Sequence, residues 1–198
     1  MRKKLFLDTQ STGLKQNTTL ISMGIVSECG SSFYAELSDY DNTQVDDWQQ
    51  ENVIDKLRMS KPSNDEEEYY QASRSEGNPK GTSLYDGYSV QFRGDREVLK
   101  VELERWLAQF EEVEIWGDCL AFDWVLFCEV FGSSSGVPNL PKNVLYIPFD
   151  ICTLFRDKGI DPDVSRQSFS NLGNDLVKHN PLDDALLICA CFLELQLI

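Results

Sequence analysis

The sequence predicts a single α/β domain whose sheet has three antiparallel strands followed by two parallel strands, with helices on its flanks. Three strand-like runs follow one another within the first 37 residues, and two more come later, each next to a helical stretch. Strands joined by short turns pair antiparallel, whereas strands joined by a helical crossover pair parallel. Because neither an internal repeat nor an interdomain linker interrupts this order, we expect a mixed five-stranded sheet in one domain spanning residues 1–198.

The amino-terminal part of the chain predicts a strand meander followed by a helix. Apolar runs indicate strands at 4–8, 19–27 and 31–37, and a short connection containing glycine separates the last two. Residues 43–57 begin with two acids near the amino end and have a loose apolar face, which is typical of a helix. We therefore expect a β-β-β-α order up to residue 57.

Residues 58–90 form a polar segment rich in Ser, Glu, Gly, Asn and Pro. A loop of this length without structure of its own is unusual inside a compact domain. We expect an insertion here, and a lid, a partly helical segment and a disordered segment all stay open.

The second half of the chain alternates helices and strands. Residues 94–110 predict an amphipathic helix, 113–117 a buried strand, and 121–132 a buried helix that ends at glycine. Residues 143–155 predict a buried strand that runs into a short helix, and 181–198 predict a helix with proline at its start. These elements supply the two parallel strands and the flanking helices.

The acidic composition restricts the partners that the chain is expected to bind. The net charge is −15, with 33 acidic against 18 basic residues. Proteins that track long nucleic acids carry basic faces, because counterion release from phosphates drives their binding. We therefore expect the chain to hold at most a short end, with bound cations supplying positive charge locally.

The chain is expected to be a cytoplasmic protein that does not bind membranes. No apolar run approaches the roughly 18 residues needed to cross a bilayer, and the apolar stretch at 5–7 is too short for a signal peptide. The six cysteines show no CxxC or CxxH spacing and mostly have apolar neighbours. We interpret them as small buried hydrophobic residues in a reducing compartment, and not as a zinc site.

Four polar residues occupy places where packing would favour apolar ones. Asp8 ends the first strand, Asp123 interrupts an apolar run, and His179 and Asp184 stand at the start of the last helix. Taken singly, each acid has a structural explanation, as a turn residue, a helix cap or a partner of the helix dipole. Taken together, they form a set of candidate ligands on separate elements.

Two-metal phosphodiester cleavage is the chemistry that needs such a set. Carboxylates hold two divalent cations about 3.5–4 Å apart, of which one activates water and the other stabilises the leaving oxygen. Magnesium and manganese prefer oxygen ligands, and a neutral imidazole can accept the proton of the water near physiological pH.

The stretches LDTQSTGL, AFD and HNPLDDA together resemble the DEDDh class of 3′–5′ exonucleases, which have the ribonuclease H-like fold. The first motif of that class is Asp-x-Glu, commonly DTETTGL, and this chain has DTQSTGL from Asp8 to Leu14. The second motif matches Phe122-Asp123, and the third, His-x4-Asp, matches His179 to Asp184. Residues 116–127 and 146–155 resemble a small bacterial and phage group of 3′–5′ exoribonucleases, and the likeness covers most of the chain apart from the polar insertion.

This resemblance implies a role for each matching residue. Asp8 would bridge two Mg²⁺ or Mn²⁺ ions, Gln10 and Asp184 would hold the water-activating ion, and Asp123 would serve the second ion. His179 would be the general base. The residues implied to lie against the terminal nucleotide are Thr12, Gly13 and Leu14.

Glutamine stands at position 10 where the family has glutamate. The two side chains are nearly equal in size, but the amide offers one neutral carbonyl oxygen in place of a carboxylate. We therefore expect the water-activating metal to bind more weakly or to be less well positioned. Three interpretations stay open: an engineered variant that traps substrate, a natural variant with residual activity supported by another acid such as Glu36 or Asp39, and a natural pseudo-nuclease.

The sequence therefore predicts a 3′–5′ exoribonuclease that shortens the 3′ ends of short or single-stranded RNA and is impaired by Gln10. The alternative is a catalytically inactive binding module for nucleic-acid ends or for a protein partner. An acidic decoy that mimics nucleic acid is a third interpretation, but it leaves His179 unexplained. RNA is expected over DNA, although no motif here reads a 2′-hydroxyl, and the resemblance suggests a homodimer.

Overall fold

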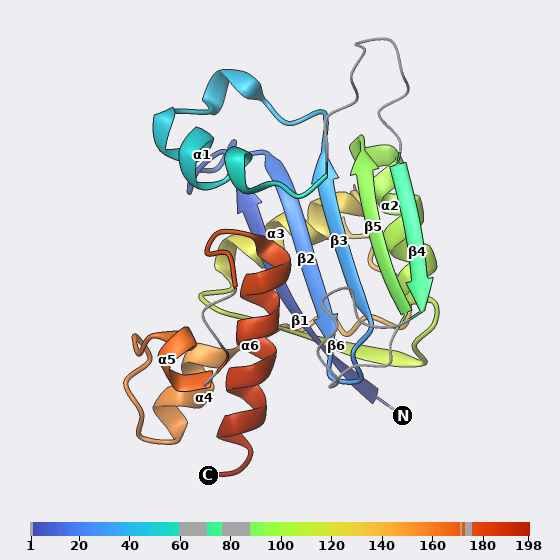
Figure 1. The fold of residues 1–198 in the computed structure, drawn as a ribbon. Coiled ribbons are helices and arrows are strands. Elements are labelled where there is room, and N and C mark those ends of the chain that lie inside the picture. Colours follow the sequence, from blue (N-terminus) through green and yellow to red (C-terminus); the bar gives the residue numbers. More distant parts are fainter. Residues whose placement is uncertain (1, 60–70, 77–87, 171, 173–175) are drawn as a thin grey trace.

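The computed structural model describes residues 2–59, 71–76, 88–170, 172 and 176–198, which build a seven-stranded sheet with helices on both faces (Figure 1). The strand order across this sheet is β4-β5-β3-β2-β1-β6-β9. Its strands are β1 (Arg2–Ser11), β2 (Leu20–Ser27), β3 (Ser32–Leu37), β4 (Gln71–Glu76), β5 (Tyr88–Gly94), β6 (Glu112–Gly117) and β9 (Phe149–Asp150). A separate hairpin consists of β7 (Ser133–Ser134) and β8 (Val137–Pro138).

The five strands expected from the sequence form the part of the sheet that runs from β3 to β9. β1, β2 and β3 pair antiparallel, and β6 and β9 add to the free side of β1 in parallel. This arrangement confirms the predicted fold class. Residues 143–155 form less strand than expected, because only a single bridge from Val144 to Val113 precedes the two residues of β9.

Two strands at the other edge of the sheet were not expected. β5 pairs in parallel with β3, and β4 pairs antiparallel with β5. Tyr88, Val90 and Phe92 do alternate with polar residues as in a strand, but the predicted insertion at 58–90 takes in the first half of this run. Arg93 near its end is polar yet buried, through an ion pair with Glu36 at 3.1 Å. Most of the predicted insertion at 58–90 lies at 60–70 and 77–87, outside the described residues.

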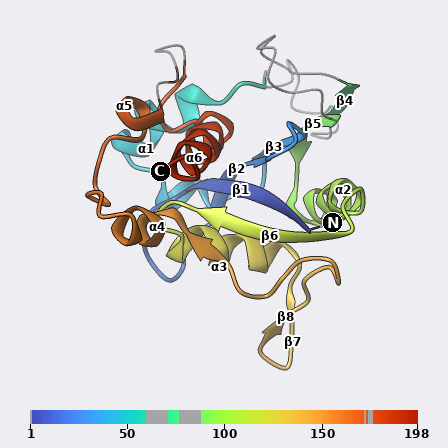
Figure 2. The same cartoon turned by 90° about the horizontal axis from the view of Figure 1, so that it is seen from below.

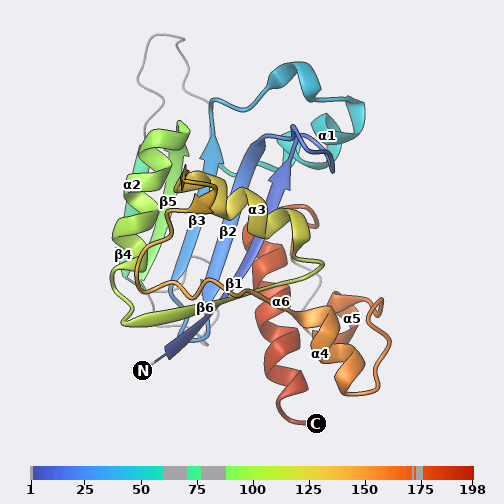
Figure 3. The ribbon, with the colours of Figure 1, turned by 180° about the vertical axis from the view of Figure 1, so that it is seen from behind.

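Helices cover both faces of the sheet (Figure 3). α2 (Arg96–Leu107) and α3 (Ala121–Val130) pack on the face to which Leu5 and Leu7 point, where the largest apolar cluster lies. α6 (Pro181–Leu195) covers the opposite face and contacts Phe6. α4 (Ile151–Asp157) and α5 (Arg166–Ser170) lie beside α6, next to the end of β9 (Figure 2).

The helix expected at 43–57 is divided into three short pieces. A 3₁₀ turn at Asn42–Gln44 precedes α1 (Asp47–Asn52), and a second 3₁₀ turn follows at Ile54–Lys56. The division occurs because Asp46 begins a new helix through a capping box with Gln49. Within the described parts of the chain, none of the helices combines the length and the apolar character that crossing a bilayer requires.

A glycine in β2 allows α6 to approach the sheet closely. A Cβ atom on Gly24 would lie 2.3 Å from the backbone of Pro181 and of Leu182, at the first turn of α6. Gly24 is also the antiparallel partner of Asp8 in β1. The missing side chain of Gly24 therefore sets how close the start of α6 comes to Asp8.

Replacing Gly24 by alanine is expected to destabilise the protein by about 3 kcal/mol or more, because the new methyl group meets backbone atoms that cannot rotate away. Chemical denaturation followed by tryptophan fluorescence would measure the loss. Gly159→Ala is the matched control, since its φ of 74° carries backbone strain while its Cβ meets open space. We expect this control to lose only about 1 kcal/mol; equal losses in the two variants would contradict the close approach of α6.

Candidate active site

Two aspartates lie side by side just beyond the parallel pairing of β1 with β6, although β1 itself continues to Ser11 and so does not end at Asp8 as the sequence predicted. Phe6 in β1 pairs with Trp116 in β6, and continuing that register by two residues brings Asp8 opposite Asp118 on the same face. Both residues line one cleft of about 560 Å³. Ligand sites in mixed and parallel sheets form where the carboxyl ends of neighbouring strands meet, and this cleft has that position.

The start of α6 brings a third aspartate to the same cleft. Pro181 is the first residue of the helix and Asn180 its N-cap, so the helix begins directly above Gly24. Asp183 is buried and forms an ion pair with Arg58 at 2.6 Å, which fixes the rotation of the first turn. Asp184 consequently lines the cleft together with Asp8.

Asp123 in the first turn of α3 is held by the residue that follows Asp8. The backbone N–H and the hydroxyl of Thr9 both donate to Asp123 Oδ1, at 2.9 and 2.5 Å. Thr9 points to the α3 face of the sheet because neighbouring residues of a strand face opposite sides. Both bonds end on Oδ1. Of the three motif aspartates, Asp8 and Asp184 line the cleft, whereas Asp123 is not among its lining residues.

The four carboxylates of Asp8, Asp118, Asp123 and Asp184, called the acidic cluster below, repel one another. Burial, followed by the charges of Asp184 and Asp123, raises the pKa of Asp8 well above its ordinary value. Burial is also the main cause that raises the pKa of Asp123 to about 6 and that of Asp184 to about 7, and Asp118 contributes to both. A cation bound among these groups would relieve this repulsion.

The protein without added metal is expected to be more thermostable at pH 5.5 than at pH 8. An acid with a raised pKa in the folded state stabilises that state fully below its unfolded pKa of about 3.9, and this contribution is lost as the pH rises through the raised value. For Asp123 and Asp184 these raised values are about 6 and about 7. Thermal unfolding in a chelator should therefore show a melting temperature that falls by several degrees from pH 5.5 to pH 8.

Asp184→Asn separates this local effect from the repulsion of the whole acidic chain. The variant has no titrating group at position 184, so its melting temperature should fall less over the same pH range. A pH dependence equal to that of the unmodified protein would mean that Asp184 does not contribute to it.

The amide of Gln10 interacts directly with Asp8. Gln10 lies two residues further along β1, on the same face, and its Nε2 donates to Asp8 Oδ2 at 2.9 Å. This hydrogen bond lowers the pKa of Asp8, against the larger effects of burial and of Asp184. The amide of Gln10 can donate this hydrogen bond to Asp8, whereas the carboxylate of a glutamate could not.

His179 lies next to Asp184, but its ring is packed against another element. The backbone of His179 hydrogen-bonds to the Asp184 carboxylate, while the imidazole packs edge-on against Trp48 of α1, with ring centroids 5.2 Å apart. Burial, then Lys178 and Lys56, lower the pKa of His179, so the imidazole is neutral at pH 7. The residue has a φ of 64°, a strained conformation that the turn into α6 imposes.

The segment after Gln10 forms a turn between β1 and β2. The Thr12 side chain is buried, and its hydroxyl donates to Gln44 Oε1 at 2.9 Å, whereas Leu14 is 80% exposed. Gly13 has a φ of 140°, which favours glycine. The surface that this turn offers to a ligand is therefore the Leu14 side chain and the neighbouring backbone.

The two acids suggested as substitutes for a glutamate at position 10 do not line the cleft. Glu36 is fully buried and pairs with Arg93, and its Oε1 accepts hydrogen bonds from the backbone of Arg58 and Met59. Asp39 accepts a hydrogen bond from the backbone of Arg96 at 3.2 Å. Both acids are therefore occupied elsewhere in the fold.

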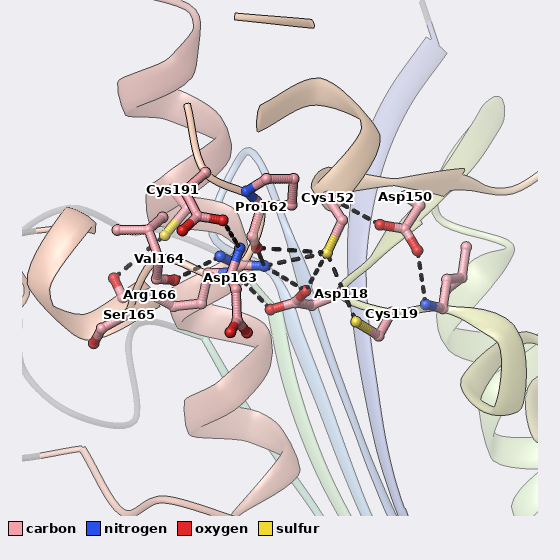
Figure 4. A network of polar contacts seen from close by, with 12 residues as sticks. Asp118, Cys119, Asp150, Cys152, Pro162, Asp163, Val164, Ser165, Arg166 and Cys191 are labelled. Atoms are coloured by element: carbon pink, nitrogen blue, oxygen red, sulfur yellow. Dashed lines mark hydrogen bonds and ion pairs between the residues drawn. The ribbon is translucent and has the colours of Figure 1, made fainter. Parts of the chain in front are cut away.

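Asp118 belongs to a polar network at the edge of the cleft that the sequence did not indicate (Figure 4). Arg166 holds Asp118 with two bonds, Nε to Oδ2 at 2.7 Å and Nη2 to Oδ1 at 2.8 Å. The sulfur of Cys152 also contacts Asp118, and Cys119 lies next to it. The signal available in the sequence was the position of Asp118, directly after a predicted strand, as for Asp8.

The expectation that the cysteines are buried holds for three of the six. Cys128, Cys189 and Cys191 are buried, whereas Cys29 and Cys119 are exposed and Cys152 is half-buried. The apolar residues around Cys119 and Cys152 in the sequence point into the core, while the two sulfurs face the cleft network.

The aspartates that match the three motifs are not gathered as closely as the ligands of a single ion. Among the described residues, only Asp118, Cys119 and Cys152 bring three potential ligand atoms within 4.8 Å of one another. Asp8, Asp123 and Asp184 act on one another electrostatically from larger separations. Two ions about 3.5–4 Å apart need such a wider arrangement of carboxylates.

No protein-family model matches the chain. The chain is similar to two curated proteins named 3′–5′ exoribonuclease, from two strains of Mycobacterium tuberculosis. Each is 23% identical over 158 residues, which cover 79% of this chain and 76% of the relative. The similarity to 3′–5′ exoribonucleases is thereby confirmed, whereas the assignment to the DEDDh class stays a prediction.

Proposed function

We propose that this chain is a metal-dependent 3′–5′ exoribonuclease of the DEDDh type whose activity is reduced by Gln10. The observation that carries the proposal is the convergence of three separate motifs: Asp8 lies in β1 just beyond its pairing with β6, Asp123 lies in the first turn of α3, and Asp184 lies in the first turn of α6, and the charges of Asp184 and Asp123 both act on Asp8. The similarity to relatives named 3′–5′ exoribonuclease supports the reaction and the RNA substrate.

The donor atoms of the cluster fit Mg²⁺ or Mn²⁺. All are carboxylate oxygens, which these ions prefer as ligands. Burial is the main cause that raises the pKa of Asp8, Asp123 and Asp184, and a bound cation would favour their ionised form. Asp8 would be shared by two ions, Asp184 and the carbonyl oxygen of Gln10 would hold one of them, and Asp123 would hold the other. Such ions, when bound, supply an activated water and neutralise the leaving oxygen.

The side chains around the cluster supply orientation and proton transfer. Thr9 fixes Asp123 so that one carboxylate oxygen stays available. His179 is neutral at pH 7 and adjoins Asp184, so a rotation of its ring away from Trp48 would bring a proton acceptor to the cleft.

The cleft is suited to the end of a chain more than to its middle. Its volume of about 560 Å³ lies in the range of small-ligand sites. Its cationic lining consists of Lys178 and Arg166, of which Arg166 is paired with Asp118. With a net charge of −15 around it, the cleft favours a short single-stranded 3′ end. The homodimer stays a prediction.

A binding module without catalysis is the second candidate. The hydrogen bond from Gln10 to Asp8 favours it, because the amide already satisfies a carboxylate oxygen that a metal would otherwise use. This candidate predicts that RNA ends bind with the same affinity in Mn²⁺ and in a chelator.

The test is digestion of single-stranded RNA labelled at its 5′ end, with Mn²⁺, with Mg²⁺ and with a chelator. The proposal expects a ladder that shortens from the 3′ end and is absent in the chelator. The same RNA with a 3′ phosphate and a DNA of equal sequence serve as substrate controls. Internal fragments, or equal cleavage in the chelator, would overturn the proposal.

A further inference from the structure

Two cysteines from separate elements bring their sulfurs into contact at the cleft. Cys119 follows β6 directly and is exposed, and Cys152 lies in the first turn of α4. The pairing of β6 with β9, in which Gly117 lies opposite Asp150, brings the two segments together. The two Sγ atoms are 3.7 Å apart (Figure 4).

The backbone around this pair is well fixed. Asp150 accepts hydrogen bonds from the backbone N–H of Cys152 at 2.7 Å and of Leu120 at 2.9 Å, so one carboxylate ties both cysteine segments. A disulfide needs an S–S distance of about 2.05 Å. The two sulfurs must therefore approach each other by about 1.7 Å to form one.

The partners of Cys152 connect the pair with the cleft. Its thiol donates to Asp118 Oδ1 at 3.0 Å, and Arg166 Nη2 donates to its sulfur at 3.2 Å. Both Asp118 and Cys119 line the cleft. A change in the bonding of Cys152 therefore alters the hydrogen bonds of the acidic cluster.

We propose that Cys119 and Cys152 form an oxidation site, a dithiol that a hydroperoxide converts into an intramolecular disulfide beside the cleft. Disulfides in reducing compartments are transient or redox-sensing, and susceptible thiols are accessible and lie next to a second, resolving thiol. Cys119 is exposed, as the thiol that reacts with the oxidant must be, and Cys152 lies next to it, as the resolving thiol must.

The reaction balances with the hydroperoxide as the two-electron oxidant. Cys119 Sγ attacks the peroxide, which breaks the O–O bond, gives Cys119 sulfenic acid and releases water when the oxidant is hydrogen peroxide. Cys152 Sγ then attacks Cys119 Sγ, the S–O bond breaks, and the S–S bond forms. Asp118, which already accepts the Cys152 thiol proton, passes that proton to the leaving hydroxide, which departs as a second water.

A soft-metal site made of Asp118, Cys119 and Cys152 is the competing interpretation of the same atoms. The Arg166 guanidinium disfavours it, because it already binds both oxygens of Asp118 and also donates to Cys152. A dication would have to displace this positive charge or lie against it. The same guanidinium does not hinder disulfide formation, which adds no charge.

The test treats the folded protein with one to five equivalents of hydrogen peroxide and measures its mass and its peptides without reduction. We expect a loss of two hydrogens, about 2 Da, in the monomer, and a linked peptide pair containing Cys119 and Cys152. Dithiothreitol should restore the original mass. The readout is independent of nuclease activity, so its failure and the failure of the proposed function are distinguishable.

Three variants make the assignment specific. Cys29→Ser removes the other exposed thiol and should leave the mass loss unchanged. Cys152→Ser should instead accumulate a sulfenic acid on Cys119 that dimedone labels, and Cys119→Ser should give neither product. Linked peptides that contain any other cysteine, or oxidation of Cys119 beyond sulfenic acid with Cys152 still a free thiol, would overturn the proposal. So would retention of the mass loss in Cys119→Ser.

Discussion

Gln10→Glu is expected to raise the rate of RNA 3′-end shortening on the order of 100-fold, because a missing metal ligand leaves the water-activating ion poorly positioned. The glutamate would lie on the same face of β1 as Asp8, two residues away, next to the cleft. Single-turnover digestion of 5′-labelled RNA in Mn²⁺ would measure the change. The added carboxylate should also tighten Mn²⁺ binding by about 10- to 100-fold in calorimetry.

The same substitution is expected to lower stability when no metal is present. The hydrogen bond from Gln10 Nε2 to Asp8 Oδ2 disappears, and a second negative charge takes its place beside a carboxylate whose pKa is already raised. Mn²⁺ should then raise the melting temperature of Gln10→Glu more than that of the unmodified protein. The rate of RNA shortening and the stabilisation by Mn²⁺ should thus both increase in Gln10→Glu, because the added carboxylate binds the metal.

Gln10→Met is the control for this experiment. Methionine is similar in size to glutamine and also removes the hydrogen bond to Asp8, but it provides no oxygen ligand. It should lose stability without gaining activity or metal affinity. If Gln10→Glu binds Mn²⁺ more tightly and still removes no nucleotides, the chain is a binding module. If its metal affinity stays unchanged, position 10 does not face a metal.

The interpretation that a nearby acid replaces the family glutamate is weakened by the fold. Glu36 is enclosed by Arg93 and the backbone of residues 58 and 59, and Asp39 accepts a hydrogen bond from the backbone N–H of Arg96, the first residue of α2. Asp118 is a further acid at the cleft, but Arg166 neutralises it through two hydrogen bonds. Asp163 also lines the cleft and is exposed, so the fold argues against Glu36 and Asp39 as substitutes and leaves Asp163 as an acid that could take over the role of position 10.

The sequence predicted the central strands and the long helices because their apolar patterns are local. It missed β5, although Tyr88, Val90 and Phe92 alternate with polar residues there, because this run follows a long polar segment and pairs with β3, which is far away in the sequence. The sequence predicted one helix at 43–57 where the structure has three short pieces. The spacing of the apolar residues indicated a continuous helix more strongly than the capping box of Asp46 and Gln49 indicated a new helix start. Long-range pairing and capping therefore set the limits of the fold prediction.

The candidate site shows the same division between local and long-range information. The motifs named Asp8, Asp123 and Asp184, because each stands at the end of a strand or the start of a helix. The sequence did not identify Thr9 or Asp118. The role of Thr9 depends on how α3 packs against β1, and the role of Asp118 depends on the register between β1 and β6. The packing of the His179 ring on Trp48 likewise follows from how α1 meets α6, which no motif encodes.

Asp8→Asn is expected to abolish RNA shortening while making the metal-free protein more stable. In the Gln10→Glu background, where the rate is high enough to measure a large loss, we expect a decrease of about 1000-fold or more, because Asp8 is the residue shared by both proposed metal sites. Burial and the charges of Asp184 and Asp123 oppose ionisation of Asp8. Removing the Asp8 carboxylate should therefore raise the melting temperature at pH 8 in a chelator by several degrees.

Asp118→Asn is the matched control, because Asp118 has the equivalent position on the neighbouring strand but is paired with Arg166. Removing its charge leaves the guanidinium short of a partner and should destabilise the protein by about 1–3 kcal/mol. The two substitutions are chemically identical and lie side by side, yet they should shift stability in opposite directions. A loss of stability in both variants would mean that Asp8 is held by structural partners like those of Asp118, and the proposed metal site would then lose its central ligand.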